Sequence, residues 1–286
     1  MNESRLTSPL RALVLGAVAY DPKVVAIWEG FRAHFLAHGL AFDFVLYSNY
    51  ERQVAAHLRG DIDVAWSSPL AWIEAERAAR QKGRRAEAIA MRDTDRDLTS
   101  VVLVRDGGPI RELADLGGKR IGVGAVDSPQ ATLIPLASLA EAGVVGVEVH
   151  HDAAAGKHGD RIGAERDAVR ALFADAVDAA CVLDVNRYAF MREGLISPDG
   201  RRAVRVVHQT APYDRCNLTV LDDGPPETQR FRELLMAMSY ESPALRPLLD
   251  LQGLKSWRPG RTSGYAQLER AVDRYGTLVA WLAHLG

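Results

Sequence analysis

Three positions place a residue with a capping side chain directly before a proline: Asp21-Pro22, Ser68-Pro69 and Ser128-Pro129. An aspartate or serine at this place accepts hydrogen bonds from the first N–H groups of a helix, and proline favours the first helical position. Each pair therefore predicts a helix start. Such a start has free N–H groups and a partial positive charge that suit an anion or a polar group. For any single pair, capping alone is the commoner explanation.

A second candidate is the segment 156–161, Gly-Lys-His-Gly-Asp-Arg, with Glu165 beyond it. Glycines on both sides of His158 free the backbone, and a histidine with a carboxylate two residues away could do acid–base chemistry or bind a metal. Side chains that could together bind a transition metal are those of His158, Asp160, Glu165 and Cys216. Nothing in their spacing demands a metal, and the plainer interpretation is a charged loop that closes over a ligand.

Strands and helices alternate around these candidates in two similar halves. The predicted strands are 12–18, 42–47 and 62–66 in the first half, and 119–126, 146–150 and 178–184 in the second. A helix is expected between each pair of successive strands, including one that a capping box at Ser48 and Glu51 would start. Each half therefore has the order β-α-β-α-β, which builds a mostly parallel sheet with helices on both faces.

Further strand-like runs at 98–105, 203–208 and 217–221 lie where the chain would pass between the halves. We expect an α/β fold of two lobes, in which residues 1–98 and 214–286 form lobe one and residues 99–213 form lobe two. The C-terminal helices would complete lobe one. Two crossovers between lobes make a hinge, and a hinge makes a cleft.

Composition and charge exclude several classes of protein. The 286 residues are 48% hydrophobic and 25% charged, an ordinary globular mix. The net charge of −2 gives no general attraction to nucleic acid or to an anionic membrane. No apolar run is long enough to cross a bilayer, and the two cysteines form no CxxC pair. We expect a monomer with no cofactor, no nucleic-acid partner and no membrane insertion.

Four stretches of the sequence resemble the phosphonate/phosphite-type solute-binding proteins of ABC importers, a branch of the type II periplasmic-binding-protein fold. These are the first strand with Tyr20-Asp21-Pro22, GDIDVAWSSPLAW at 60–72, DLGGKRIGVGAVDSPQAT at 115–132 and ADAVDAACVLD at 174–184. Together with the order of elements, the resemblance covers most of residues 10–240. It implies that a small polar or anionic solute binds in the cleft, that the hinge then closes, and that an importer permease is a partner.

The resemblance also implies which side chains contact the solute. The candidates are Tyr20, Ser48 (or Tyr47 beside it), Ser67, Ser68, Ser128, Gln130, Thr132, His158 and Asp184. Tyr213, which lies at the predicted return crossover, is added to them. In this family the second-lobe helix start usually offers several hydroxyls and amides to an oxyanion. Here Pro129 lacks an N–H, Ala131 lacks a hydroxyl and Asp127 adds a negative charge. An uncharged, zwitterionic or amine-bearing ligand suits Asp127 and Asp184 better than a phosphonate dianion does.

A second reading is an enzyme. Some proteins of this fold are cytoplasmic enzymes that use the cleft as an active site, and the four residues of the metal hypothesis would then do the chemistry. The chain begins MNESRLTSPL, and no basic cluster precedes its first apolar stretch. As written it predicts a cytoplasmic protein, whereas a removed leader would make it periplasmic. We expect a binding protein rather than an enzyme, with no catalytic residue.

Overall fold

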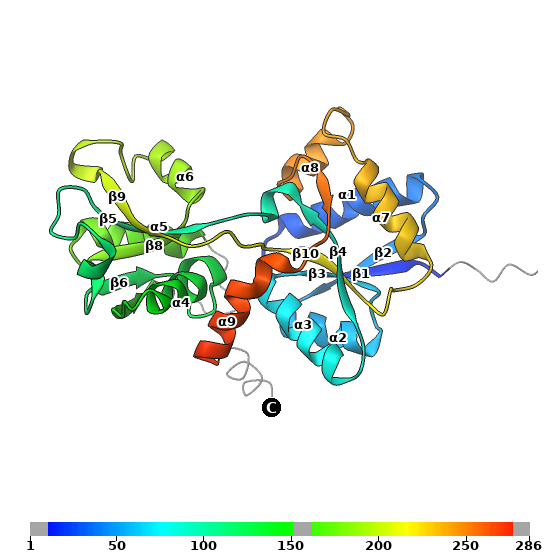
Figure 1. Cartoon of the computed structure of the whole chain (residues 1–286). Helices are drawn as coiled ribbons and strands as arrows, with labels where there is room; N and C mark the ends of the chain where they lie inside the picture. Colours follow the sequence, from blue (N-terminus) through cyan, green and yellow to red (C-terminus); the bar gives the residue numbers. More distant parts are fainter. Residues whose placement is uncertain (1–10, 152–161, 277–286) are drawn as a thin grey trace, which may run out of the picture. The chain divides into compact units, whose positions relative to one another are not determined.

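The structure is a computed structural model that describes residues 11–151 and 162–276 (Figure 1). It divides into two compact units. Unit 1 comprises the chain up to Thr94 together with Cys216–Arg261, and unit 2 comprises Asp95–Arg215 together with the chain from Thr262 onward. The chain therefore passes between the units three times.

Unit 1 is built on a six-stranded sheet with the order β11-β4-β10-β3-β1-β2. Its strands are β1 (Leu13–Val18), β2 (Phe42–Tyr47), β3 (Val64–Ser67), β4 (Ala86–Arg92), β10 (Asn217–Leu221) and β11 (Trp257–Pro259). Its helices are α1 (Lys23–Ala37), α2 (Tyr50–Arg59), α3 (Pro69–Gln81), α7 (Glu227–Ala237) and α8 (Arg246–Gln252). Helices α1, α7 and α8 cover one face of this sheet, and α2 and α3 cover the other (Figure 1).

An aromatic cluster fills the space between this sheet and α1, α7 and α8. The ring of Phe35 lies 4.8 Å from that of Phe42 and 5.0 Å from that of Phe231. Trp66 and Trp257 meet edge to face at 6.0 Å. The helix positions that the apolar spacing predicts to be inward, among them Phe35, are fully buried.

Unit 2 is built on a five-stranded sheet with the order β7-β6-β8-β5-β9. Its strands are β5 (Ser100–Arg105), β6 (Arg120–Val123), β7 (Val147–His150), β8 (Ala179–Leu183) and β9 (Val204–Gln209). Its helices are α4 (Ile134–Glu141), α5 (Ile162–Phe173), α6 (Asn186–Arg192) and α9 (Ala266–Tyr275), and a π-helical turn, η3 (Pro129–Leu133), leads into α4.

The two sheets repeat one arrangement, which confirms the predicted α/β class. In unit 1, β1 pairs in parallel with β2 on one side and β3 on the other. In unit 2, β6 pairs in parallel with β7 and β8 in the same way. An antiparallel strand follows next in each sheet, β10 beside β3 and β5 beside β8. The sequence pattern did not predict β4 and β11, which complete unit 1.

The C-terminal helix differs from the expectation that residues 214–286 all belong to lobe one. Helix α9 contacts α4 and η3 of unit 2. Its buried side chains are Leu268, Ala271 and Val272, and the Tyr265 hydroxyl just before it donates to the Arg215 carbonyl at 2.7 Å. The apolar stripe of an amphipathic helix predicts that one face is buried, but it does not name the surface that covers this face.

Helix α2 begins one residue later than the predicted capping box requires. The Asn49 Oδ1 atom accepts the Arg52 N–H at 2.9 Å, so Asn49 and not Ser48 is the capping residue. Ser48 is exposed at the end of β2. Serine and asparagine both cap helices well. Because β2 ends at Tyr47 and α2 begins at Tyr50, Asn49 is the residue directly before the helix.

We therefore expect Asn49→Ala to lower the free energy of unfolding by about 1 kcal/mol, because the Arg52 N–H loses its acceptor. The matched change Ser48→Ala should cost at most about 0.5 kcal/mol, as for most surface substitutions. Urea unfolding of the two variants measures the difference. An equal loss in both would mean that Ser48 shares the capping role.

Candidate functional site

One edge of the unit 1 sheet gathers the predicted contacts of the first half. Parallel strands end there, and open α/β sheets bind ligands outside the carboxyl ends of their strands. Tyr20 follows β1 and is 45% exposed. Ser48 follows β2, and Ser67 ends β3. Ser68 is buried and caps α3, since its Oγ atom accepts the Ala71 N–H at 3.1 Å.

Ser67 is part of a buried hydroxyl–amide network. Its Oγ atom lies 2.8 Å from Thr219 Oγ1, and the Thr219 hydroxyl donates to Asn217 Oδ1 at 2.6 Å. All three side chains are buried. This network joins β3 to β10 through side chains as well as through the backbone, so Ser67 already has a structural role.

Gln53, on α2, is a polar group at this edge that the sequence analysis missed. Its Nε2 atom donates to the carbonyls of Gly16 at 2.7 Å and Trp66 at 3.0 Å, which ties α2 to β1 and β3. The side chain is fully buried, and its Oε1 atom accepts no hydrogen bond in the described part of the chain. The sequence signal for this group is a polar residue, Gln53, next to Val54 on the side of α2 that the apolar spacing predicts to be buried.

Glu74, on α3, is a half-buried acid of unit 1. Burial, assisted by the nearby carboxylate of Glu51, raises the pKa of Glu74 to about 8. Glu74 is therefore mostly neutral at pH 7, which removes most of the cost of burying it.

In unit 2 the carboxyl ends of β6 and β8 carry most of the second-half candidates. η3 begins directly after the loop that follows β6, and Ser128 caps it by accepting the Ala131 N–H on its Oγ atom at 3.2 Å. Gln130 and Thr132 lie within this turn, and all three predicted residues are buried. The Thr132 Oγ1 atom has no hydrogen-bond partner among the described residues.

A chain of hydrogen bonds joins η3 to the return segment. The Ser100 hydroxyl donates to the Gln130 carbonyl at 2.6 Å, and the Tyr213 hydroxyl lies 2.6 Å from Ser100 Oγ. Because Ser100 has already used its proton, Tyr213 donates to it. Burial raises the pKa of Tyr213, so the phenol stays neutral. The structure thus brings two predicted residues, Gln130 and Tyr213, together through Ser100, which the sequence analysis had not named.

Glu165, on α5, lies at the same edge and is almost completely buried. Its Oε2 atom accepts the Leu183 N–H at 2.9 Å and the Asn186 amide at 2.8 Å, and its Oε1 atom lies 3.5 Å from Gln130 Nε2. Burial raises its pKa to about 7, although these donors oppose the shift. Glu165 therefore connects α5, the end of β8, the start of α6 and η3.

Asp184 follows β8 directly, beside the Leu183 N–H that reaches Glu165. Its Oδ1 atom accepts the Arg187 Nε–H at 2.7 Å, and its own N–H donates to the Thr99 carbonyl at 2.9 Å. The carboxylate of Asp184 is thus paired with a cation of α6, the helix that follows it. Asp184 is at the predicted edge, but its charge is already balanced.

The metal hypothesis finds no support in the described part of the molecule. His158 and Asp160 lie outside the described residues. Cys216 belongs to the hydrophobic core of unit 1, whereas Glu165 is bound by amides in unit 2. Within residues 11–151 and 162–276, no three His, Cys, Asp or Glu side chains gather as a metal site. Sequence spacing could not show that Cys216 packs among apolar side chains.

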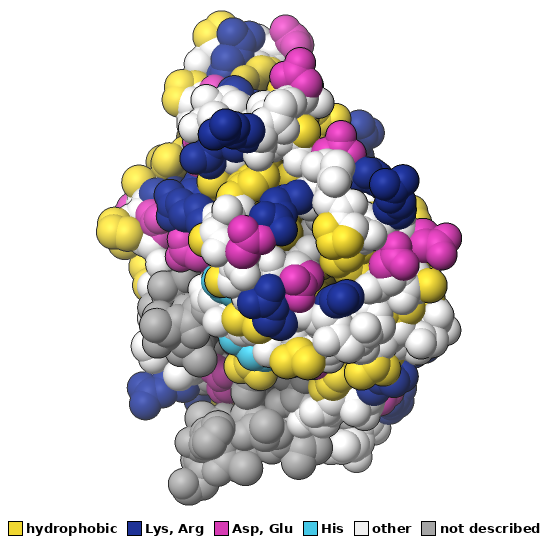
Figure 2. All heavy atoms as spheres, turned by 90° about the vertical axis from the view of Figure 1, so that its left-hand side faces the viewer, with side chains coloured by type: hydrophobic (Ala, Val, Ile, Leu, Met, Phe, Trp, Pro, Cys, Tyr) yellow, Lys and Arg dark blue, Asp and Glu magenta, His cyan; other side chains and the backbone are white. Residues whose placement is uncertain are grey.

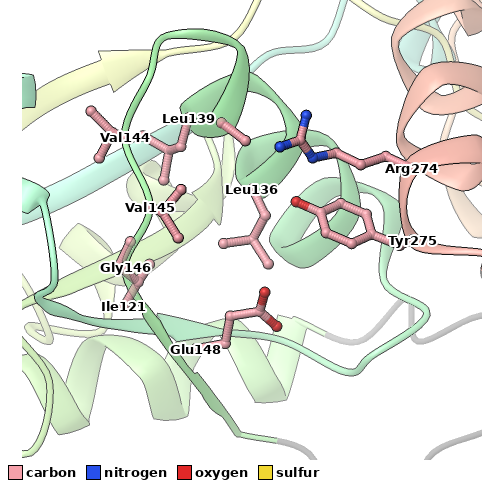
Figure 3. A pocket seen from close by; sticks show the side chains of 10 residues that line it. Ile121, Leu136, Leu139, Val144, Val145, Gly146, Glu148, Arg274 and Tyr275 are labelled. Carbon is pink, nitrogen blue, oxygen red and sulfur yellow. The ribbon is translucent and has the colours of Figure 1, made fainter.

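A separate hollow of about 130 Å³ lies elsewhere in unit 2, near the start of β7. Figure 3 shows Arg274 and Tyr275, at the end of α9, directed toward Leu136, with Glu148 below them. Its other walls are mostly apolar. Since Gly146 precedes β7, the hollow lies toward the amino end of that strand, away from the edge that holds Ser128 and Glu165.

The surface and the helices add two observations. On the face shown in Figure 2, basic and acidic side chains are interspersed with hydrophobic ones, so neither sign of charge forms a continuous patch there. None of the helices in the described ranges combines the length and the hydrophobicity that crossing a membrane requires.

Comparison with known proteins assigns the chain to a family. Residues 18–265 match the sequence model of the family described as ABC transporter, phosphonate, periplasmic substrate-binding protein. The chain belongs to this phosphonate-binding family. No curated protein sequence matches the chain.

Solved structures related to this family share the fold. PhnD1 from Prochlorococcus marinus, in complex with methylphosphonate, is 17% identical with a TM-score of 0.64, covering 93% of this chain and 98% of its own. A Xanthomonas citri protein bound to chloride is 20% identical with a TM-score of 0.66, covering 92% and 99%. The sulphonate-binding protein SsuA from Escherichia coli is 16% identical with a TM-score of 0.56, covering 95% and 89%. The type II periplasmic-binding-protein fold is therefore confirmed.

Proposed function

We propose that this member of the phosphonate-binding family binds one small polar solute and delivers it to the permease of an ABC importer. One observation carries the proposal. In each sheet the central parallel strand leads into a capped helix start. After β1, Asp21 Oδ1 accepts the Lys23 N–H at 2.9 Å, and after β6, Ser128 Oγ accepts the Ala131 N–H at 3.2 Å. Equivalent edges of both units thus present a helix N-terminus to a ligand.

The proposed solute contacts are the ten sequence candidates. In unit 1 they are Tyr20, Ser48, Ser67 and Ser68, and in the rest of the chain they are Ser128, Gln130, Thr132, His158, Asp184 and Tyr213. Support is strongest for Thr132, because its hydroxyl is buried without a partner among the described residues. A buried polar group is normally hydrogen-bonded, and a bound solute would supply the missing partner.

The solute class that we propose is phosphonate-like or zwitterionic. PhnD1 was solved with methylphosphonate, and the Xanthomonas citri protein was solved with chloride and with ATP. Asp127, which the sequence places directly before the Ser128 cap, is the reason for including a solute that also bears a positive group. Binding would shift the protein toward a closed form, as hinge-bending binding proteins do.

We further propose that the protein acts as a monomer and does no chemistry on its solute. Gel filtration with light scattering tests the monomer. Unchanged solute recovered after long incubation with the purified protein tests the absence of catalysis. Fractionation of cells that express the natural gene distinguishes the cytoplasm from the periplasm, where the family acts.

Thr132→Val tests the binding site. The change removes a hydroxyl that has no protein partner, so we expect the melting temperature to stay the same or to rise slightly. Solute affinity, measured by isothermal titration calorimetry with the solute that native mass spectrometry finds on the purified protein, should fall about tenfold, the value of one hydrogen bond.

Thr228→Val is the matched control. Thr228 lies on α7 of unit 1, away from the carboxyl edges, and its Oγ1 atom is also buried without a partner among the described residues. We expect this variant to keep full affinity. Equal affinity in Thr132→Val and the natural protein would remove Thr132 from the site, and the absence of any bound solute would contradict the proposed function.

A further inference from the structure

Two histidines lie one turn apart at the C-terminal end of helix α1. His34 is in the last turn of the helix, and His38 directly follows its last residue. Side chains four residues apart on a helix share one face. The ring centres of the two histidines lie 4.3 Å apart, with the ring planes tilted by 41°. His34 is half-buried and His38 is exposed, so an ion in solution can reach the pair.

A hydrogen bond orients the ring of His38. Its Nδ1 atom lies 2.8 Å from the carbonyl oxygen of His34. A carbonyl oxygen only accepts hydrogen bonds, so Nδ1 carries the proton, and the lone pair of the neutral ring is on Nε2. Histidines that bind metals are commonly held in this way, with one ring N–H donated to a backbone carbonyl and the other nitrogen bound to the ion.

The other ring nitrogens of the pair have no protein partner in residues 11–151 and 162–276. There, no hydrogen bond or ion pair engages the Nε2 atom of His38 or either ring nitrogen of His34. Burial, assisted by the neighbouring His38, lowers the pKa of His34, so the ring of His34 is neutral at pH 7. Each ring therefore has a lone pair that an ion can use.

Helix capping explains only one of the two histidines. A histidine at the C-terminal end of a helix often bonds to the last carbonyl groups, as His38 does. Capping gives no reason for a second imidazole ring packed against the first. When two imidazole nitrogens bind one ion at about 2.0–2.1 Å, the ring centres come to about 4–5 Å from each other, a range that includes the observed separation.

We propose that His34 and His38 form a binding site for one divalent transition-metal ion, of the class of Cu²⁺, Ni²⁺ and Zn²⁺. Helical zinc sites hold their ion with two histidines at this same spacing. Imidazole suits these three ions, whereas Mg²⁺ prefers oxygen ligands. No third His, Cys, Asp or Glu side chain of the described residues joins the pair. The protein thus supplies two ligands, and water completes the coordination.

This metal site is separate from the proposed solute contacts. Helix α1 leads from the carboxyl end of β1 to the amino end of β2, which begins at Phe42, four residues after His38. The two histidines therefore lie at the opposite end of β2 from Ser48. The inference does not depend on the proposed function, and a failure of either one leaves the other intact.

Titration calorimetry at pH 7 with copper(II) chloride and nickel(II) chloride tests the site. We expect the tightest site to take one ion per chain and to prefer copper to nickel, and we expect no binding of magnesium chloride. His34→Ala and His38→Ala should each weaken this site at least about tenfold, the smallest loss expected when support for a bound metal is removed. Leu36→Ala, which changes an exposed residue between the two histidines, should bind as the natural protein does.

The double variant His34→Ala, His38→Ala distinguishes a shared site from two separate ones. If both rings hold the same ion, either single change already destroys the chelate, so the double variant should lose little more affinity than either single variant. Losses that add in full would mean that the two histidines bind independently, and this result overturns the inference.

Electron paramagnetic resonance with one equivalent of Cu²⁺ gives a second readout. We expect splitting from two imidazole nitrogens in the natural protein and in Leu36→Ala, and from at most one in each histidine variant. Circular dichroism checks folding, and the exposed His38 also allows His38→Gln, which should weaken copper binding like His38→Ala. A tightest copper site that survives in both single variants overturns the inference.

Discussion

Glu165→Gln is expected to make the ligand-free protein more stable than the natural one at pH 8, by about 3 kcal/mol, and to give no gain at pH 4. Burial raises the pKa of Glu165 in the folded protein from 4.5 to about 7. Each pKa unit corresponds to about 1.4 kcal/mol of free energy. Glutamine keeps an oxygen for the Leu183 N–H and the Asn186 amide but carries no charge to bury.

The sign follows from proton binding. Between pH 4.5 and about 7 the folded protein holds a proton on Glu165 that the unfolded chain has lost. The free energy of unfolding of the natural protein therefore falls as the pH rises across this window and stays low above it. Below the window both states are protonated, and the advantage of glutamine disappears.

Urea unfolding followed by circular dichroism at pH 4, 6 and 8 measures this effect. Glu241→Gln, which changes an exposed acid, should follow the natural protein within about 0.5 kcal/mol at each pH. If Glu165→Gln were less stable than the natural protein at pH 8, the carboxylate would be stabilising, and the charge would already have a partner.

Phe35→Ala should cost unit 1 about 3–5 kcal/mol of unfolding free energy, the range for truncating a large buried aromatic side chain. Phe35 is fully buried, and its ring lies 6.0 Å or less from those of Phe31, Phe42 and Phe231. The neighbouring aromatic rings are packed in the same core, so they can close the cavity only in part. Tryptophan fluorescence reports the loss, because Trp66 and Trp257 belong to the same core.

Leu36→Ala is the matched control on the same helix. Leu36 is 51% exposed, so its truncation removes little buried area and should cost less than about 1 kcal/mol. Similar losses in the two variants would mean that the aromatic cluster does not carry the stability of this unit.

Much of the fold could be predicted because short apolar runs and capping pairs are local signals. The runs at 12–18 and 42–47 form β1 and β2. Ser68 caps helix α3 as predicted, and Ser128 caps the π-helical turn η3 that leads into α4. Strands β4 and β11 were harder to find, because β4 (AEAIAMR) is rich in alanine, which is depleted in strands, and β11 has only three residues.

The candidate site was less predictable, because burial and pairing depend on contacts between distant segments. Glu165 was a candidate, together with Cys216, only in the alternative metal hypothesis, and in the structure it meets the backbone of Leu183 and the amide of Asn186. Ser100 was seen only as part of a strand, although it joins Gln130 to Tyr213. No local pattern indicates such partners.

The three passes of the chain between the units have a consequence for synthesis on the ribosome. Unit 1 lacks β10 and β11 until its second segment, Cys216–Arg261, has been made, and unit 2 waits longer still for α9. Neither unit can be completed while the nascent chain is short, in contrast to proteins whose domains fold one after another as they emerge. Both units thus acquire their last elements only after residue 215 has been made, and the sheet of unit 1 stays incomplete until then.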